Sequence, residues 1–150
     1  MAQRLINKRY VFSFRTLFAT LTLLVFPMGV WGEDVSVAQE SNFGTSSSYY
    51  WALTNGNTYT LNADITLTRY LYIQSGSTVT IDLNGHTLNR DMAGAQNNCF
   101  VIKIDGTLTI KDSGTGGIIR GGYNNSDGGG VYNNGTLTMT GGTITGNRVA

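Results

Sequence analysis

The sequence predicts an all-β fold, a right-handed parallel β-helix in which coils of about 29 residues stack into a solenoid. Three observations lead to this prediction. Similar stretches recur at a constant spacing, apolar residues alternate with threonines inside each stretch, and turn-forming residues precede each one. A coil of this kind buries its apolar side chains only when its neighbours stack on it.

The recurrence is visible in three stretches that read GSTVTIDLNGHTL (76–88), GTLTIKDSGTGGII (106–119) and GTLTMTGGTI (135–144). Aligned positions in these stretches recur every 29 residues, and two sets of them are predicted to form internal stacks. The two predicted stacks are Val79, Leu108 and Leu137, and Ile81, Ile110 and Met139. Ile73, Ile102 and Val131 keep the same step and extend the alignment backwards. Threonines alternate with these residues, so we expect rows of Thr on the outer face. A flexible linker would not keep one register over a dozen positions.

Each predicted coil contains three short strands and three corners. Two-residue corners precede the first strands at Gly76-Ser77, Asp105-Gly106 and Asn134-Gly135, residue types that tolerate positive φ. A second strand follows a Gly-x-x-aliphatic pattern that ends at Leu88, Ile119 or Ile144, and 100–104 is the clearest third strand. The alternative is an antiparallel sandwich of Asx-Gly hairpins, which predicts no constant coil length.

Residues 1–32 have the layout of a secretory signal peptide. Lys8, Arg9 and Arg15 precede an apolar run (17–26), and a Pro-Met-Gly breaker and small residues follow it. The run is shorter than the roughly 18 residues that a membrane span needs. An uncleaved N-terminal anchor and a buried helix are the alternatives. We therefore expect a secreted or cell-surface protein that meets a membrane only through export or anchoring.

The rest of the chain divides into an N-terminal capping segment (33–60) and β-helix repeats (61–150). The capping segment is less regular, as terminal repeats are expected to be. The repeats stop at TITGNRVA, in the middle of a coil, so we expect a truncated piece of a longer protein or an edge that stacks on a partner. Residues 33–150 alone are predicted to self-associate edge to edge.

Composition excludes several classes of function. The formal net charge is +1 and only 13% of residues are charged, so no strong field attracts a polyanion and nucleic acid is not an expected partner. Cys99 is the single cysteine, which excludes an internal disulfide and a multi-cysteine metal site, and its apolar context predicts burial. Twenty glycines against one proline fit many tight turns.

The coil residues resemble those of bacterial surface proteins with pectin-lyase-like right-handed β-helix repeats. The matching pieces are ADITL, SGSTVTIDLNGHTL and GGGVYNNGTLTMTGGTITGN, and the last is also similar to repeats of autotransporter-like polymorphic outer-membrane proteins. The resemblance covers about residues 58–147 and is more specific for the fold than for function. It implies an exported, adhesin-like passenger at the bacterial outer membrane or outside the cell.

Two loops of variable length, 89–98 and 120–129, are the predicted binding region. The candidate ligand-binding residues there are Arg90, Arg120, Tyr123, Asn124, Asn125 and Asp127. The expected ligand is a host or matrix protein or a glycan, bound passively through many weak contacts. No cofactor is expected. NNSDGGG (124–130) faintly resembles a Ca²⁺ loop but occurs once, so a plain flexible loop is favoured over Ca²⁺ binding.

The main alternative is a polysaccharide lyase or glycoside hydrolase on the same scaffold. It requires that Asp82, Asp112 or Asp127 approach Arg90 or Arg120 in one groove. The lone His86 has no nucleophile or carboxylate motif beside it in the sequence and is interpreted as a polar corner residue. A truncated product without function is the second alternative.

Overall fold

The structure is a computed structural model that describes residues 32–150. The predicted all-β class is confirmed, because the described residues form short strands and one 3₁₀ turn, η1 (Glu40–Phe43). The signal-peptide prediction (1–32) lies outside the described residues except for Gly32. None of the helical structure in residues 32–150 is long and apolar enough to cross a membrane.

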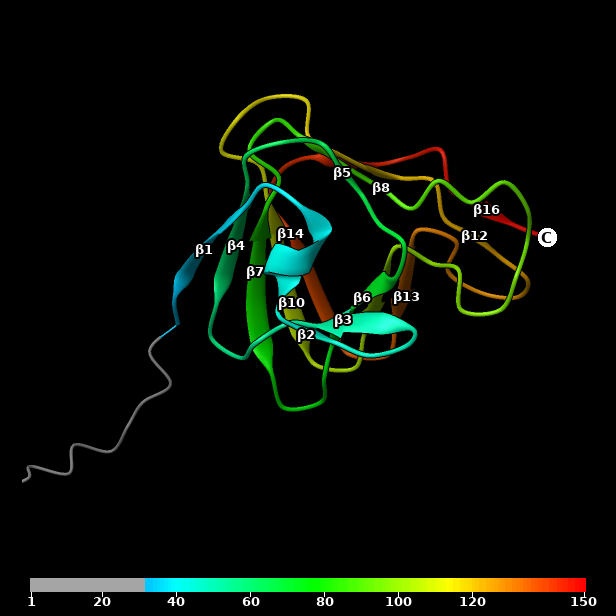
Figure 1. Ribbon diagram of the computed structural model, residues 1–150, viewed down its shortest axis with the longest axis horizontal. Coiled ribbons are helices and arrows are strands. Elements are labelled where there is room, and N and C mark those ends of the chain that lie inside the picture. The colour runs from blue at the N-terminus through cyan, green and yellow to red at the C-terminus, as the bar shows by residue number, and fades with distance from the viewer. Residues whose placement is uncertain (1–31) are drawn as a thin grey trace, which may run out of the picture.

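Within residues 32–150 the strands form three larger sheets and one small one (Figure 1). The first sheet contains, in order, β1 (Asp34–Val37), β4 (Thr58–Leu61), β7 (Thr78–Asp82), β10 (Thr107–Lys111) and β14 (Thr136–Met139). The second contains β15 (Thr143–Ile144), β11 (Ile118–Arg120), β8 (Thr87–Asn89) and β5 (Ile65–Thr66). The third contains β13 (Val131–Asn133), β9 (Ile102–Ile104), β6 (Tyr70–Ile73), β3 (Tyr50–Ala52) and β2 (Thr45–Ser46), and the fourth pairs β12 (Tyr123–Asn124) with β16 (Arg148–Val149). Among these described strands every pairing is parallel except β2 with β3.

The predicted register of the first sheet is confirmed. Leu108 pairs with Val79 of the preceding repeat and with Leu137 of the following repeat. In the third sheet, the predicted alignment of Ile73 with Ile102 is wrong. Leu71 is the partner of Ile102, and Ile73 pairs with Ile104. A shift by two positions leaves every side chain on the same face, so the apolar pattern alone does not distinguish the two registers.

The spacing between paired strands is not constant along the chain. Trp51 pairs with the nearby Leu71, whereas Leu88 pairs with Ile119, which lies much farther along the sequence. The loops that connect the strands differ in length, and this accounts for the unequal spacing. Extra residues in a surface loop cost little free energy. The predicted constant spacing therefore describes the first sheet from β7 to β14 and the step from β9 to β13.

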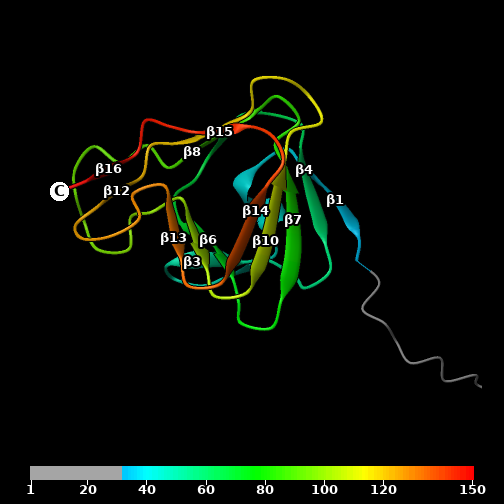
Figure 2. The ribbon, with the colours of Figure 1, turned by 180° about the vertical axis from the view of Figure 1, so that it is seen from behind.

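The core is a continuous set of aliphatic side chains from the three larger sheets. At one end, η1 places Phe43 against Tyr59, and both side chains are buried (Figure 1). At the other end lie the last strands of the sheets, nearest the viewer in Figure 2. There the predicted core position Met139 is 39% exposed, so its assignment to the core is wrong in this chain, and Ile144 is 36% exposed. No strand of residues 32–150 packs beyond them.

The predicted corners before β7, β10 and β14 are observed, but the glycines serve different purposes. Gly76 has a φ of 78°, as the sequence predicted. Gly106 and Gly135 do not have positive φ. A Cβ at Gly106 would lie 2.5 Å from the carbonyl oxygen of Ser77, so close backbone approach requires glycine at this corner.

Candidate functional site

The two predicted binding loops lie against each other and project to one side of the sheets with β12 and β16 (Figures 1 and 2). The backbone N–H of Gln96 donates to the Tyr123 carbonyl, and that of Asn125 donates back to Gln96. Strand β12 lies inside the 120–129 loop and pairs with β16. Of the predicted loop NNSDGGG, Asn124 thus lies in a strand and Asn125 is hydrogen-bonded to the other loop.

Two cavities of about 380 Å³ each lie on either side of Asn97 and Asn98, which line both. We call them the Asp127 cavity, which Phe100 and Asn124 also line, and the Arg90 cavity. Asn98 has a φ of 60°, a backbone conformation that asparagine adopts more readily than most residues. The Asn97-Asn98 turn is thus a shared wall between two polar hollows.

The buried side chain of Asn124 connects two parts of the chain at the Asp127 cavity. Its side chain is 4% exposed, its Oδ1 accepts a hydrogen bond from the Cys99 N–H (3.2 Å), and its Nδ2 donates to the Asp127 carbonyl (2.6 Å). Both ends of the amide are therefore engaged within the protein. Cys99 is buried, as predicted. Asp127 itself is exposed and lines the cavity.

Arg90 is half-buried and lines the second cavity. Its Nη1 donates to the Leu67 carbonyl (3.0 Å), whereas its Nε is buried with no hydrogen-bond partner among the described residues. Burial lowers the pKa of this guanidinium, and the electrostatic influence of Cys99 and Glu40 offsets part of that effect. Even with its pKa lowered by burial, the Arg90 guanidinium remains charged at neutral pH.

The other predicted residues lie outside the two cavities. The Tyr123 ring is half-buried beneath the Arg148 guanidinium, 5.9 Å from the ring centroid. Asn125 is exposed and donates a hydrogen bond to Asn97 Oδ1 (3.1 Å). Arg120 is exposed and lines neither cavity. The structure thus brings Arg90, Asn124 and Asp127 around one turn and leaves Arg120 aside.

Of the three carboxylates that the lyase alternative named, only Asp127 lies near one of these arginines, and it lines the other cavity from Arg90. Asp82 and Asp112 lie at the corners after β7 and β10, where both bind backbone N–H groups. Asp82 forms an ion pair with Lys111 (3.2 Å), and no described carboxylate forms one with Arg90 or Arg120. His86 lies 3.5 Å from the exposed Asp64. Among residues 32–150 no group of three or more His, Cys, Asp or Glu side chains is placed to hold a metal ion.

Sequence reasoning missed part of the site. Arg69 lines the Arg90 cavity, and Lys103 and Tyr132 line the Asp127 cavity, yet all three lie in or beside strands of the third sheet. The Asn-Asn pair at 97–98 was the one available signal, because paired asparagines favour turns. Only the folded structure shows that outward-facing side chains of the third sheet line the two cavities together with residues of the loops.

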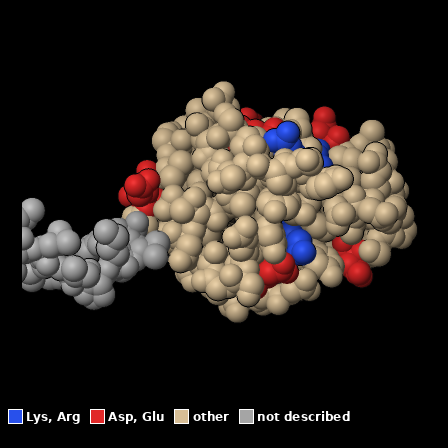
Figure 3. Space-filling model, turned by 60° about the horizontal axis from the view of Figure 1, so that its bottom comes forward, with Lys and Arg blue, Asp and Glu red and all other residues tan. Residues whose placement is uncertain are grey.

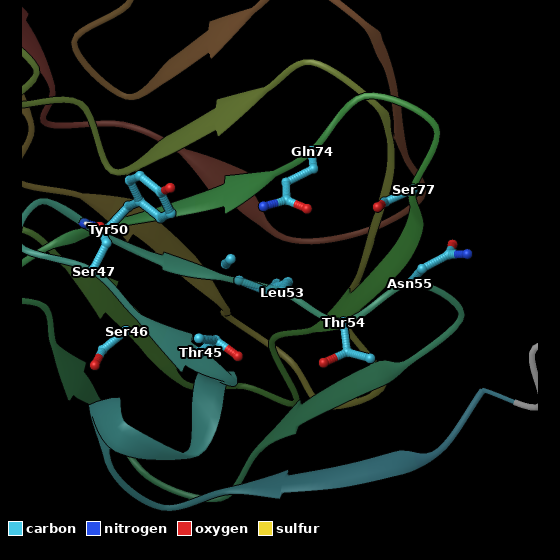
Figure 4. Close-up of a pocket in the computed structure, with 10 residues that line it drawn as sticks. Thr45, Ser46, Ser47, Tyr50, Leu53, Thr54, Asn55, Gln74 and Ser77 are labelled. Carbon is cyan, nitrogen blue, oxygen red and sulfur yellow. Dashed lines mark hydrogen bonds between the residues drawn. The ribbon is translucent and has the colours of Figure 1, made fainter.

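A third cavity, of about 470 Å³, lies near the β2–β3 hairpin, and its lining side chains are uncharged (Figure 4). Gln74 points toward the enclosed space, and Asn55 accepts a hydrogen bond from the Thr78 N–H. On the face drawn in Figure 3, charged residues of both signs are sparse and interspersed. No single-sign patch marks that face as a binding surface.

No protein-family model, curated protein or solved structure matches the chain.

Proposed function

We propose that the chain is an exported right-handed parallel β-helix that acts at the cell surface as a structural or adhesive module. The parallel pairing of equally spaced strands β7, β10 and β14 in the first sheet supports the solenoid. The layout of residues 1–32 supports export. The resemblance to pectin-lyase-like surface proteins and polymorphic outer-membrane passengers supports a bacterial outer-membrane or extracellular location.

The observation that carries an adhesive role is the pair of cavities around Asn97 and Asn98. Backbone hydrogen bonds anchor the two loops to each other and the 120–129 loop to β16, so a ligand loses little free energy in ordering them. Asp127, Lys103 and the amides offer donors and acceptors of both kinds. Binding rather than turnover fits this set, because Asp82 and Asp112 bind backbone N–H groups elsewhere and Asp127 is left without a second carboxylate in the cavity lining.

A binding screen tests this function. The full chain is applied to a glycan array and to immobilised host matrix proteins, alongside the variants Asp127→Ala and Asn97→Ala. We expect at least one class of ligand to bind, and both variants to weaken it by about tenfold, a typical result for the loss of a contacting polar group. Thr54→Ala, in the uncharged third cavity, is the control and should bind like the wild type.

Absence of binding to every glycan and protein would overturn the adhesive role. Equal losses in Thr54→Ala and the loop variants would show that the two cavities are not the site.

A further inference from the structure

The Arg90 cavity has an electrostatic character that the other two cavities lack. Arg69 and Arg90 both line it, and none of its lining residues is acidic. Neither arginine forms an ion pair within residues 32–150. The Arg69 guanidinium also lies over the Trp51 ring, 5.3 Å from its centroid, and the charge of Glu40 acts on Arg90 without an ion pair. Two arginines at one cavity with no acidic residue in its lining leave positive charge that an anionic ligand could neutralise.

Glu40 is the acidic residue that contacts the segment around Arg69, and its carboxylate already accepts hydrogen bonds from neighbouring groups. Glu40 accepts hydrogen bonds from the Trp51 indole N–H (2.5 Å), the Thr68 backbone N–H (3.0 Å) and the Arg69 backbone N–H (3.1 Å). Burial by itself raises the pKa of this carboxyl, but these donors outweigh it and the pKa lies below 4.5. Glu40 therefore fixes the backbone that carries Arg69 without entering an ion pair with it.

Arg90 is held in position for a ligand. Its Nη1 is anchored on the Leu67 carbonyl, and its backbone N–H donates to the Arg120 carbonyl. The buried, unpaired Nε costs free energy in the free protein. A negative charge beside the guanidinium offsets part of this desolvation, which is the physical reason to expect an anion there. The Nη groups are suited to a planar carboxylate, which arginine binds through two parallel hydrogen bonds.

The remaining walls favour a sugar as the carrier of that carboxylate. Tyr49 is 71% exposed and offers an aromatic face, and Tyr70 lies deeper in the cavity. Gln96, Asn97 and Asn98 supply amides that both donate and accept hydrogen bonds, as ring hydroxyls require. A peptide would be recognised by side-chain pockets or by strand addition at a sheet edge, and this cavity is lined mainly by polar and aromatic side chains.

We propose that the Arg90 cavity binds the carboxylate of an acidic glycan, with Arg90 and Arg69 as the anionic-group contacts. This rests on the proposed adhesive function and names the chemical class of its ligand. The Asp127 cavity, on the other side of Asn97 and Asn98, is then placed to hold a neighbouring neutral sugar.

Two matched pairs of sugars test the proposal on the full chain by isothermal titration calorimetry. The pairs are sialyllactose with lactose, and methyl glucuronide with methyl glucoside. In at least one pair we expect the acid to bind about tenfold to a hundredfold more tightly than its neutral partner, the range for a charge-assisted hydrogen bond. The preference should weaken as salt concentration rises.

Arg90→Gln and Arg69→Gln should each abolish most of the preference for the acid. Arg120→Gln is the matched control, because it removes the same charge from an exposed arginine outside both cavities. Arg69→Gln also guards against a folding defect in Arg90→Gln, since Arg69 has no buried unpaired nitrogen. An unchanged preference in folded Arg90→Gln and Arg69→Gln would overturn the proposal.

The remaining outcomes separate this proposal from the adhesive function. If neutral and acidic sugars bind equally, the adhesive function stands and the carboxylate site is refuted. If a pentaglutamate peptide binds through Arg90 and neither acidic sugar does, the glycan assignment is overturned in favour of an acidic protein segment. If no sugar, peptide or matrix protein binds, both proposals fail together.

Discussion

Asp82 is the clearest example of one side chain that joins successive repeats. It is 3% exposed, and its Oδ1 accepts hydrogen bonds from the backbone N–H of Asn84 (3.0 Å) in its own turn and of Ser113 (2.9 Å) in the next repeat. Its Oδ2 lies 3.2 Å from Lys111 Nζ. Burial alone would raise the pKa of Asp82, but these donors outweigh it and the pKa lies below the ordinary 3.8.

The lowered pKa of Asp82 predicts a loss of stability in acid. A carboxyl whose pKa is lower in the folded than in the unfolded chain contributes stability that is complete at neutral pH, and that declines as pH falls through and below 3.8. We expect Asp82→Asn to be less stable than the wild type at pH 7 and to show a smaller difference between pH 7 and pH 3. Urea unfolding followed by circular dichroism at both pH values measures this.

Lys111→Met serves as the control for that measurement, because it removes the ion pair and leaves the backbone donors to Asp82 in place. It should retain more of the pH dependence than Asp82→Asn. Identical pH dependence in the wild type and Asp82→Asn would contradict the assignment.

Asp105 joins repeats in a similar way at the corner before β10. Its carboxylate accepts hydrogen bonds from the Tyr72 hydroxyl (2.6 Å) and from Asn134 Nδ2 (3.1 Å), which lie in the repeats before and after it. The bond to Asp105 raises the pKa of Tyr72 to about 12, and the bond from Tyr72 lowers the pKa of Asp105. Hydrogen bonds from polar side chains at the corners therefore link successive repeats at the surface, and packing of aliphatic side chains links them in the core.

Among the elements, the corners limit how closely the repeats stack. At Gly106 an added Cβ would collide with the carbonyl oxygens of Gln74 and Ser77, which are backbone atoms of the preceding corner. These atoms cannot move away as a flexible side chain can. The spacing of parallel strands thus requires a residue without a side chain at this position.

Gly106→Ala is predicted to destabilise the fold by about 2–3 kcal/mol, the cost of forcing extra atoms into a packed site. Gly94→Ala is the matched control, because Gly94 does not have positive φ and no atom lies within 4 Å of its added Cβ. Thermal and urea unfolding of the two variants gives the comparison. Equal stability of Gly106→Ala and Gly94→Ala would show that the corner relaxes more freely than its contacts indicate.

The elements also show how far the pattern of residues predicts the fold. Alternation of Thr with Leu, Val or Ile indicated which side of each strand faces inward, and the register of β7, β10 and β14 followed from the repeat. The partner of Ile102 was predicted two positions away from its true place. A slip of this size buries the same kind of side chain, so hydrogen bonds in the folded chain decide it.

In the whole molecule, the two ends of the stack differ. The end that carries η1 buries Phe43, whereas the end formed by β13 to β16 exposes apolar side chains and one unpaired backbone edge per sheet. Met139, Ile144 and Val149 are 36% to 49% exposed there. Such an edge is a template for pairing with another strand.

The chain is therefore predicted to self-associate through this end in a concentration-dependent way. Ile144→Lys and Val149→Lys should each shift the sedimentation profile toward the monomer, because a charge at the edge opposes strand pairing. Ser75→Lys adds the same charge at an exposed corner and should leave association unchanged. A monomer at all concentrations, with no effect of either edge variant, would refute the prediction.

The candidate site, like the fold, could be predicted in part from a comparison of the repeats along the sequence. Variable loop length pointed to 89–98 and 120–129, and Arg90, Asn124 and Asp127 do surround one turn. Loop position alone did not reveal that the amide of Asn124 is consumed by Cys99 and Asp127, since that requires the two loops to meet.

The pattern of residues was enough to establish the all-β class, the parallel pairing of the aligned repeats and the direction in which strand side chains point. Those properties follow from local alternation and from a repeat length that is visible along one chain. Folding in three dimensions was needed to show which loops form cavities, that Arg69 and Arg90 share one of them, and that Arg120 does not. Residues far apart in the chain meet there because strands stack laterally, and no periodicity records which outward side chains become neighbours.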